Sequence, residues 1–308
     1  MNDRYRLLTR LGEGGFGCVH LAQDLHTGRR VAIKQLRFDT PDARARFERE
    51  ARTLLRNVDN AHVVEILDHD LSATPPYLVL EYCEHGSLRS WVGTRVSWQN
   101  VAGALAHAVN GLQGIHQAGG FHRDVKPDNL LVASDPRDSG RSVIIKVADF
   151  GLARDPQSAT SLMTRSPAGT DGYIAPEVRA GSPFTAAADI FSLGIVACEL
   201  LTGERSTSRI GSTPIPDRFR RVVRSMLSPI PGQRPGARTV AAELSAILAE
   251  PAEATTEKAN ASGIGGVVFG GLLAGGALLA LAALAGGNDK EWDNRVKRHR
   301  SPDGRFSS

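Results

Sequence analysis

The sequence predicts an α+β fold in which a small, sheet-rich lobe is followed by a larger helical lobe. From residue 5 to about residue 80 the pattern is strand-like and rich in turns, with one charged, helix-periodic stretch at 41–57. Beyond residue 82, apolar positions recur three and four residues apart at 98–116 and again at 187–202, as they do in amphipathic helices. We therefore expect one sheet with a single helix first, and mostly helices afterwards.

The composition narrows the class of protein. A chain of 308 residues, 41% of them apolar, can bury a substantial core. Its formal charge of +4 comes without a long lysine or arginine run in the first 250 residues, so we expect no nucleic-acid partner. The three cysteines lie far apart, which argues against disulfides or a zinc site and favours a reducing compartment. No secretory signal precedes the first lobe, which should therefore stay in the cytoplasm.

Three glycines near the start of the chain form a GxGxxG pattern. Gly12, Gly14 and Gly17 lie between strand-like segments at 7–11 and 18–22. Glycines in such a place let backbone amides approach phosphates without obstruction by side chains. Alone the motif is weak, because a flexible hairpin turn explains it as well. A dinucleotide-binding fold would need a helix to begin here, whereas the sequence returns to a strand at 30–35.

Lys34 ends the run Val31-Ala32-Ile33-Lys34 within this third strand. It is either a surface lysine or a phosphate contact, and in the second case a counter-charge must hold it. Glu50, in the helix-like segment 47–55, is the favoured partner. Glu48 stays an alternative, and an offset of two residues would point the two side chains to different faces of a helix.

Two motifs further along the chain carry the strongest signal. His122-Arg123-Asp124-Val125-Lys126-Pro127-Asp128-Asn129 is followed, after a strand-like segment at 143–147, by Asp149-Phe150-Gly151. With these motifs in this order, residues 5–248 resemble the Ser/Thr protein kinase family in its bacterial, eukaryotic-like branch. The resemblance implies a bilobal protein-kinase fold with an N-lobe at about 5–82 and a C-lobe at about 83–248. It also implies transfer of the γ-phosphoryl group of ATP to serine or threonine hydroxyls of proteins.

The resemblance also implies roles for individual residues. Asp124 matches the carboxylate that accepts or orients the proton of the substrate hydroxyl. Asn129 and Asp149 match the side chains that hold Mg2+, with Mn2+ as the alternative metal. Lys126 matches a lysine that contacts the γ-phosphate, and Thr170, in Gly169-Thr170, would form a hydrogen bond near it. Both features favour serine and threonine over tyrosine as the acceptor.

The nucleotide is expected in contact with residues of both lobes. Adenine would lie among Val19, Ala32 and Leu131, with Leu80 behind it and the backbone of 81–83 at its edge. Ordinary core packing explains these apolar residues as well. The residues expected to bind the nucleotide are Gly12, Gly14, Gly17, Val19, Ala32, Lys34, Leu80, Glu81, Cys83 and Leu131.

Further family features concern the scaffold and its switching. Glu177, in Ala175-Pro176-Glu177, would pair with Arg234, and Asp189 would cap the catalytic loop, which is the segment 122–129. Arg123 would bind a phosphate group on the activation segment. In that segment the favoured phosphate acceptors are Thr164 and Ser166, and further candidates are Thr160 and Ser161. The segment 203–216 is shorter than the family's usual substrate-docking segment, so substrate choice is less predictable by analogy.

A 25-residue segment without charged or polar side chains, 263–287, follows a linker at 249–262 and precedes a basic polar tail at 288–308. As a helix it would exceed the roughly 30 Å hydrocarbon core of a bilayer. We expect a transmembrane or membrane-associated segment that makes this a single-pass protein of the cytoplasmic membrane. Small-xxx-small spacings such as Gly266 to Gly270 permit a homodimer, although the glycine pairs rotate around the helix.

The topology of this segment contains a conflict. The basic cluster after it prefers the cytoplasm, yet a kinase before it needs cytoplasmic ATP, and one crossing cannot satisfy both. A tail anchor with the kinase domain facing the cytoplasm is the expectation. A re-entrant or interfacial segment is the alternative.

Two other functions compete with an active protein kinase. A pseudokinase or binding module would use the same fold without chemistry, but the joint presence of Lys34, Asp124, Asn129 and Asp149 argues against it. A small-molecule phosphotransferase would share the phosphate residues but would leave the activation-segment ending at 169–177 without a purpose.

Overall fold

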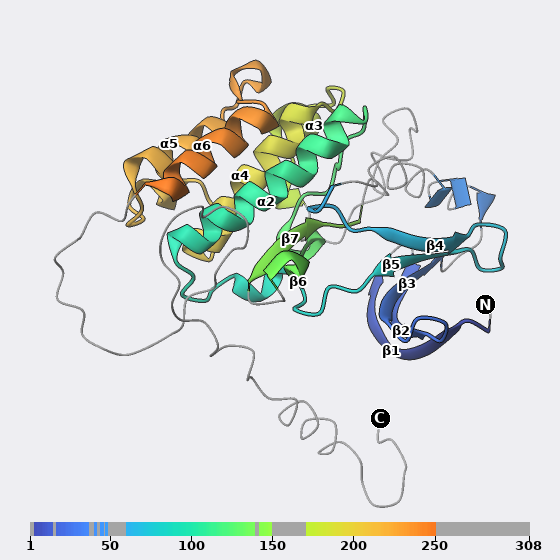
Figure 1. The fold of residues 1–308 in the computed structure, drawn as a ribbon. Helices are drawn as coiled ribbons and strands as arrows, with labels where there is room; N and C mark the ends of the chain where they lie inside the picture. The colour runs from blue at the N-terminus through green and yellow to red at the C-terminus, as the bar shows by residue number, and fades with distance from the viewer. Residues whose placement is uncertain are drawn as a thin grey trace, which may run out of the picture.

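The computed structural model describes residues 3–14, 17–36, 60–138, 142–149 and 171–250, with 40–41, 44–45 and 47–48. They form two lobes, a curved sheet on one side and a group of helices on the other, with a small two-stranded sheet between them (Figure 1). The predicted α+β architecture of two lobes is therefore confirmed.

The first lobe is an antiparallel sheet of five strands in the order β1-β2-β3-β5-β4. The strands are β1 (Tyr5–Gly14), β2 (Gly17–Asp24), β3 (Arg30–Leu36), β4 (Ile66–Asp70) and β5 (Tyr77–Glu81). The glycine motif spans the β1–β2 hairpin, in which Gly14 is paired with Gly17. A Cβ atom on Gly17 would lie 2.2 Å from the Gln35 carbonyl oxygen, so only glycine fits beside β3 there. The expected strand-turn-strand context is confirmed.

The two faces of this sheet have different environments, because side chains alternate along each strand. One face carries a small core of its own that includes Val31, Ile33 and Val79. The other face carries Ala32 and Lys34 of β3, and Leu78 and Leu36 on this side join the main core of the second lobe. The chemically interesting face of the sheet is thus the one that faces the rest of the molecule.

The second lobe is helical. Its helices are α2 (Trp98–Gln117), the short α3 (Pro176–Arg179), α4 (Ala186–Thr202), α5 (Asp217–Met226) and α6 (Ala237–Ala249). The Ser97 side chain caps α2 by accepting from the Asn100 amide, and Gly203 ends α4 in the left-handed region with φ 77°. The expected helices at 98–116 and 187–202 are confirmed, whereas α5 was not predicted.

A hairpin of β6 (Leu130–Ser134) and β7 (Val143–Val147) lies between the two lobes (Figure 1). β7 packs on α2 so closely that a Cβ atom on Gly111 would lie 2.6 Å from Val147 Cγ2. β6 follows directly after Asn129, and β7 ends two residues before Asp149. The hairpin therefore brings two of the predicted motifs to the same end of a rigid element.

Several predictions concern residues outside the described part of the chain. The first is most of the helix at 41–57, including Glu50. The second is the segment 150–170, with Thr170 and the four hydroxyl candidates. The third is the part of the chain from residue 251 onward. Within the described residues, no helix has the length and apolar character needed to span a bilayer. The segment 203–216 contains one 3₁₀ turn, Ser208–Gly211, whose Ile210 is buried in the main core.

Candidate active site

An ion pair joins the first lobe to the end of β7. Lys34, buried on β3, places its Nζ atom 2.7 Å from Oδ1 of Asp149. The charge of Lys34 is the main cause that lowers the pKa of Asp149, so the carboxylate is ionised at neutral pH. Asp149 has a φ of 59°, a backbone conformation that costs a non-glycine residue about 1–3 kcal/mol and is typical of functional sites. The carboxylate is still 49% exposed, so a ligand can reach it.

Two side chains of the loop before β6 converge on the carboxylate of Asp124. Lys126 Nζ lies 2.7 Å from Oδ2 of Asp124. The side-chain amide nitrogen of Asn129 donates to the same Oδ2 at 2.9 Å and to the Asp124 carbonyl at 2.8 Å. Because the amide nitrogen of Asn129 is used in this way, its Oδ1 is the atom that can bind a cation. Asp124 is thus held in one orientation by a cation and an amide.

Asn129 and Asp149 lie next to each other because of the register of the hairpin. Leu130 pairs with Val147, and the Ala148 amide donates to the Asn129 carbonyl at 2.9 Å. An amide oxygen and a carboxylate are the ligand types that Mg2+ prefers. The described residues contain no group of three or more His, Cys, Asp or Glu side chains that could hold a metal alone. The Asn129 and Asp149 side chains could hold a Mg2+ ion together with phosphate oxygens and water.

A buried histidine, His122, links the backbone of Asp124 to the residue that precedes Asp149. The Asp124 amide donates to Nδ1 of His122 at 3.2 Å, so the proton of this ring is on Nε2, which donates to the Ala148 carbonyl at 2.8 Å. The carboxylate of Asp189 on α4 accepts from the amides of His122 and Arg123, both at 2.9 Å. The predicted cap of the catalytic loop by Asp189 is confirmed.

The residues expected around adenine lie on both sides of this site. Val19 is paired with Lys34 and Ala32 with Leu80, so all four side chains share the inner face of the sheet. Leu80 and Leu131 pack against a common small cluster that contains the buried Cys83.

The backbone at 81–83 can be described more closely than the sequence allowed. The Glu81 amide donates to the Glu65 carbonyl at 3.0 Å, and the Glu81 side chain pairs with Lys146 at 2.7 Å. At Glu81 the expected contact with adenine is therefore through the carbonyl, and the expectation for the backbone of 82–83 is unchanged. Burial raises the pKa of Cys83 to about 12, which keeps its thiol protonated and unreactive.

The predicted ion pair between Glu177 and Arg234 is also present. Two nitrogens of the buried Arg234 donate to the two carboxylate oxygens of Glu177, both at 2.7 Å. The same guanidinium donates to the Ala187 and Ser228 carbonyls and lies over the ring of Phe191. This arginine ties α3 to the start of α4 and to the turn before α6.

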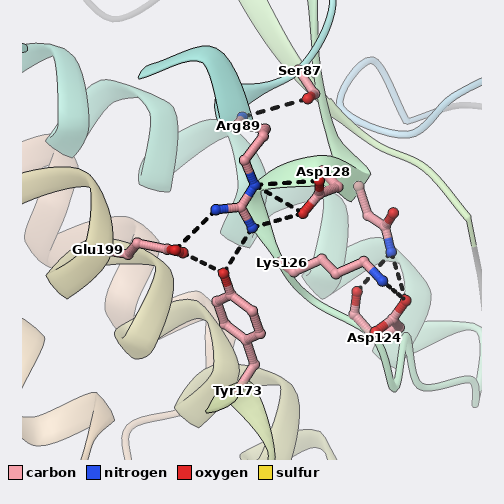
Figure 2. Close-up of polar contacts among 8 residues, drawn as sticks. Ser87, Arg89, Asp124, Lys126, Asp128, Tyr173 and Glu199 are labelled. Atoms are coloured by element: carbon pink, nitrogen blue, oxygen red, sulfur yellow. Dashed lines mark hydrogen bonds and ion pairs between the residues drawn. The ribbon is translucent and has the colours of Figure 1, made fainter. Parts of the chain in front are cut away.

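A second polar cluster beside the catalytic loop was missed. Arg89, in the 3₁₀ turn Leu88–Trp91, binds Asp128 of the catalytic loop, Tyr173 and the buried Glu199 of α4 (Figure 2). These partners are 39, 84 and 110 residues away from it along the chain. No local spacing could have indicated the cluster.

Comparison with known proteins agrees with this geometry. The family model described as protein kinase domain matches residues 5–244. Serine/threonine-protein kinase Pkn1 of Myxococcus xanthus is 36% identical over 207 residues, which is 65% of this chain and 29% of that protein. Serine/threonine-protein kinase PknB is 36% identical over 239 residues in Mycobacterium leprae (74% and 37%) and 35% over 259 residues in Mycolicibacterium smegmatis (80% and 39%).

The chain spans between 29% and 39% of the length of these curated relatives. The match to the family model nevertheless covers both lobes and includes Lys34, Asp124, Asn129 and Asp149. The chain therefore belongs to the protein kinase family.

Proposed function

We propose that this protein is an ATP-dependent kinase that transfers the γ-phosphoryl group of ATP to serine or threonine hydroxyls of protein substrates. The observation that carries the proposal is the ion pair between Lys34 and Asp149, beside a catalytic loop in which Lys126 and Asn129 hold Asp124. Similarity to bacterial serine/threonine-protein kinases supports the choice of reaction.

The proposed reaction is an in-line displacement at phosphorus. The substrate oxygen attacks the γ-phosphorus, the bond from phosphorus to the β–γ bridging oxygen breaks, and ADP leaves. Asp124 orients the hydroxyl and takes up its proton, an effect worth about 10² to 10⁴ in rate for general bases. Lys126 places a positive charge next to Asp124, where charge develops on the transferred group.

Asn129 Oδ1 and the Asp149 carboxylate are the groups proposed to hold Mg2+, with Mn2+ as the alternative. When bound, the ion would neutralise charge on the phosphate oxygens of ATP. Lys34 keeps Asp149 ionised and would contact the nucleotide phosphates from the sheet. A Cβ atom on Gly12 would meet no described atom within 4 Å, so the space beside the hairpin is open to a ligand there.

The test is phosphoryl transfer by the full chain, purified in detergent, with γ-labelled ATP and a general protein acceptor. Asp124→Asn should reduce incorporation by about 10²-fold or more. The matched control is Asp217→Asn, because Asp217 is an 81% exposed carboxylate of the same lobe and should not matter. Analysis of the labelled amino acids should find phosphoserine or phosphothreonine. Equal labelling by the unaltered protein and Asp124→Asn, or label on tyrosine alone, would reject the proposal.

Regulation and location belong to the same proposal. We propose autophosphorylation within the activation segment, on Thr160, Ser161, Thr164 or Ser166, and attachment to the cytoplasmic membrane through 263–287, with the kinase domain in the cytoplasm. The support is the number of hydroxyl groups in that segment and the uncharged run of 25 residues. The same run permits association into a homodimer.

Protease protection tests the topology. A tag after residue 308 should be protected in sealed inside-out vesicles if 263–287 crosses the membrane, while the kinase domain should be digested. Digestion of the tag in intact vesicles would instead indicate a re-entrant or interfacial segment, and recovery of the chain in the wash would reject membrane attachment.

A further inference from the structure

The backbone of Arg89 is held in place by its own turn and by contacts to β6. The 3₁₀ turn that carries it is capped by Ser87, whose Oγ accepts from the Arg89 amide at 3.4 Å. Ser87 itself forms a β-bridge with Leu131 of β6, and β6 follows the catalytic loop directly. The backbone of Arg89 is therefore tied to the element that ends the catalytic loop.

The guanidinium of Arg89 binds three groups from three parts of the chain. Nε and Nη2 donate to the Asp128 carboxylate at 3.2 and 2.7 Å. Nη1 donates to Oε1 of Glu199 at 2.9 Å, and Nη2 also donates to the Tyr173 hydroxyl at 2.9 Å. The Tyr173 hydroxyl in turn donates to the other oxygen of Glu199. Figure 2 shows this ring of contacts beside Asp124 and Lys126.

The three partners of Arg89 come from parts of the chain that have different roles. Asp128 lies between Lys126 and Asn129, the two residues that hold Asp124. Tyr173 comes three residues after Thr170, at the end of the segment that carries the hydroxyl candidates. Glu199 is buried on α4 and provides a rigid support for both. One planar cation thus connects the catalytic loop, the end of the activation segment and the core of the lobe.

The cluster depends on an arginine in particular. The planar guanidinium of an arginine can donate to three acceptors in fixed directions, whereas the ammonium of a lysine is a point charge on a flexible side chain. Two carboxylates, Asp128 and Glu199, lie against this one cation. Burial, followed by the hydrogen bond to Glu199, raises the pKa of Tyr173, so its hydroxyl stays protonated and keeps donating.

We propose that Arg89 is a positioning residue that couples the end of the activation segment to the catalytic loop. By holding Asp128 and Tyr173 with one guanidinium, it sets the place of Asp124, Lys126 and Asn129 for phosphoryl transfer. The inference rests on the proposed kinase function and adds to it a residue that touches neither nucleotide nor acceptor.

The test separates positioning from general stability through kcat and KM. Arg89→Lys keeps the charge but loses the fork, so kcat should fall about tenfold or more, since small misplacements of reacting groups are costly. KM for ATP should stay within about twofold, because Lys34 and the other nucleotide residues of the sheet are not part of this cluster. Tyr173→Phe removes one oxygen and should lower kcat in the same manner.

Arg137→Lys is the matched control. Arg137 also binds a carboxylate through Nε and Nη2, at 2.9 and 2.7 Å to Asp135, but at the far end of β6. Its kcat should equal that of the unaltered chain. In the double variant Arg89→Lys/Tyr173→Phe the two losses in kcat should be less than multiplicative, because both changes break the same connection.

Amide exchange gives a second readout that does not depend on activity. Arg89→Lys should speed exchange at 124–129 and 171–173 several-fold while leaving that of α2 unchanged, and Arg137→Lys should not. Unchanged kcat and exchange in a folded Arg89→Lys protein would overturn the inference, as would a loss confined to KM for ATP. If Arg89→Lys does not fold, Tyr173→Phe decides by the same criteria. Absence of transfer by the unaltered chain would count against the kinase function alone, because exchange still reports on Arg89.

Discussion

Asp189 is a completely buried carboxylate, and the hydrogen bonds that it accepts hold the catalytic loop from below. Its donors are the amides of His122 and Arg123 and the ring of His116, each at 2.9 Å. Arg123 has a φ of 70°, a conformation that costs a non-glycine residue roughly 1–2 kcal/mol. The bonds to Asp189 offset that cost, so the position of Asp124 depends on a residue of α4.

Replacing Asp189 should therefore affect both stability and catalysis. In Asp189→Asn, an NH2 group replaces one carboxylate oxygen and faces the N–H donors that this oxygen accepted from. We therefore expect a loss of about 3 kcal/mol in the free energy of unfolding. The loss is measured by urea denaturation. Activity should fall even at temperatures where the variant is folded. The control, Asp217→Asn, should change stability by less than about 0.5 kcal/mol, because that carboxylate is exposed. A stable, fully active Asp189→Asn protein would contradict this account.

Arg234 offers a comparison between a buried and an exposed arginine. Its side chain is fully buried and donates to a carboxylate and two carbonyls. Arg234→Lys can satisfy only part of these acceptors, so thermal unfolding should show a loss of about 2 kcal/mol or more. Arg218→Lys should cost less than about 0.5 kcal/mol, because the pairs of Arg218 with Glu243 and Glu250 are exposed. Equal losses in the two variants would show that the burial of Arg234 is not what matters.

At this scale the sequence motifs and the family resemblance predicted the catalytic-loop contacts and the distant pair of Glu177 with Arg234, but they missed the cluster of Arg89. Asp124, Lys126 and Asn129 lie within one short motif, and the structure brings them into contact. The expected pair of Lys34 with Glu50 lies outside the described residues and stays a prediction, whereas the pair of Lys34 with Asp149, 115 residues away, was not predicted. Arg89 carries no local pattern, because its role exists only after folding brings its partners together.

Among the elements, β7 is held along its outer edge by two stacked histidines. His62 donates through Nδ1 to the Ile145 carbonyl, and the Ile145 amide donates to Nδ1 of His107, both at 3.2 Å. The two rings lie 4.4 Å apart with an interplanar angle of 26°. Burial lowers the pKa of His62 below its ordinary value of 6.5. The strand that leads to Asp149 therefore depends on an uncharged imidazole.

This arrangement predicts how stability changes with pH. Below pH 6.5 His62 is protonated in the unfolded chain but resists protonation in the folded chain. The free energy of unfolding should therefore fall as the pH decreases from 7 to 5. His62→Gln keeps a neutral donor and should flatten that slope in chemical denaturation. His69→Gln, at an exposed position of β4, should leave the slope unchanged. An unchanged slope in His62→Gln would assign the acid sensitivity to other groups.

The close approach of α2 to the β7 region makes a second prediction about elements. A Cβ atom on Gly111 would lie 2.4 Å from the His62 carbonyl oxygen, which is backbone and cannot move away easily. Gly111→Ala should cost about 1–3 kcal/mol by overpacking, measured as a lower midpoint in urea. Gly232→Ala meets no described atom within 4 Å and should be neutral. Tolerance of Gly111→Ala would mean that α2 and β7 are free to separate.

The same elements show what periodicity can and cannot predict. α2 and α4 were predicted because long apolar faces repeat over several turns, and β1 to β3 because turn residues separate them. α5 was missed, since its ten residues include four arginines and only two turns of apolar spacing. The pairing of β6 with β7 also depends on contacts that no single segment reveals.

For the whole molecule, the contact between the two lobes is expected to become stronger when nucleotide binds. The Lys34–Asp149 ion pair crosses from the sheet to the hairpin, and both residues are proposed to contact metal-bound phosphates. A ligand that binds only the folded state stabilises it by about 2.7 kcal/mol at 100 times its Kd. A non-hydrolysable ATP analogue with Mg2+ should therefore raise the Tm of the full chain by several degrees, and EDTA should reverse most of the increase.

Variants at the two ends of the ion pair test whether both lobes take part. Lys34→Met and Asp149→Asn should each abolish the increase in Tm caused by the analogue, because each removes one side of the phosphate site. Lys146→Met is the control, since this lysine pairs with Glu81 at 2.7 Å and is not expected to contact phosphate. An undiminished increase in Asp149→Asn would place the metal elsewhere. An undiminished increase in Lys34→Met would mean that the sheet contributes only apolar contacts to the nucleotide, and that the C-lobe alone holds its phosphates.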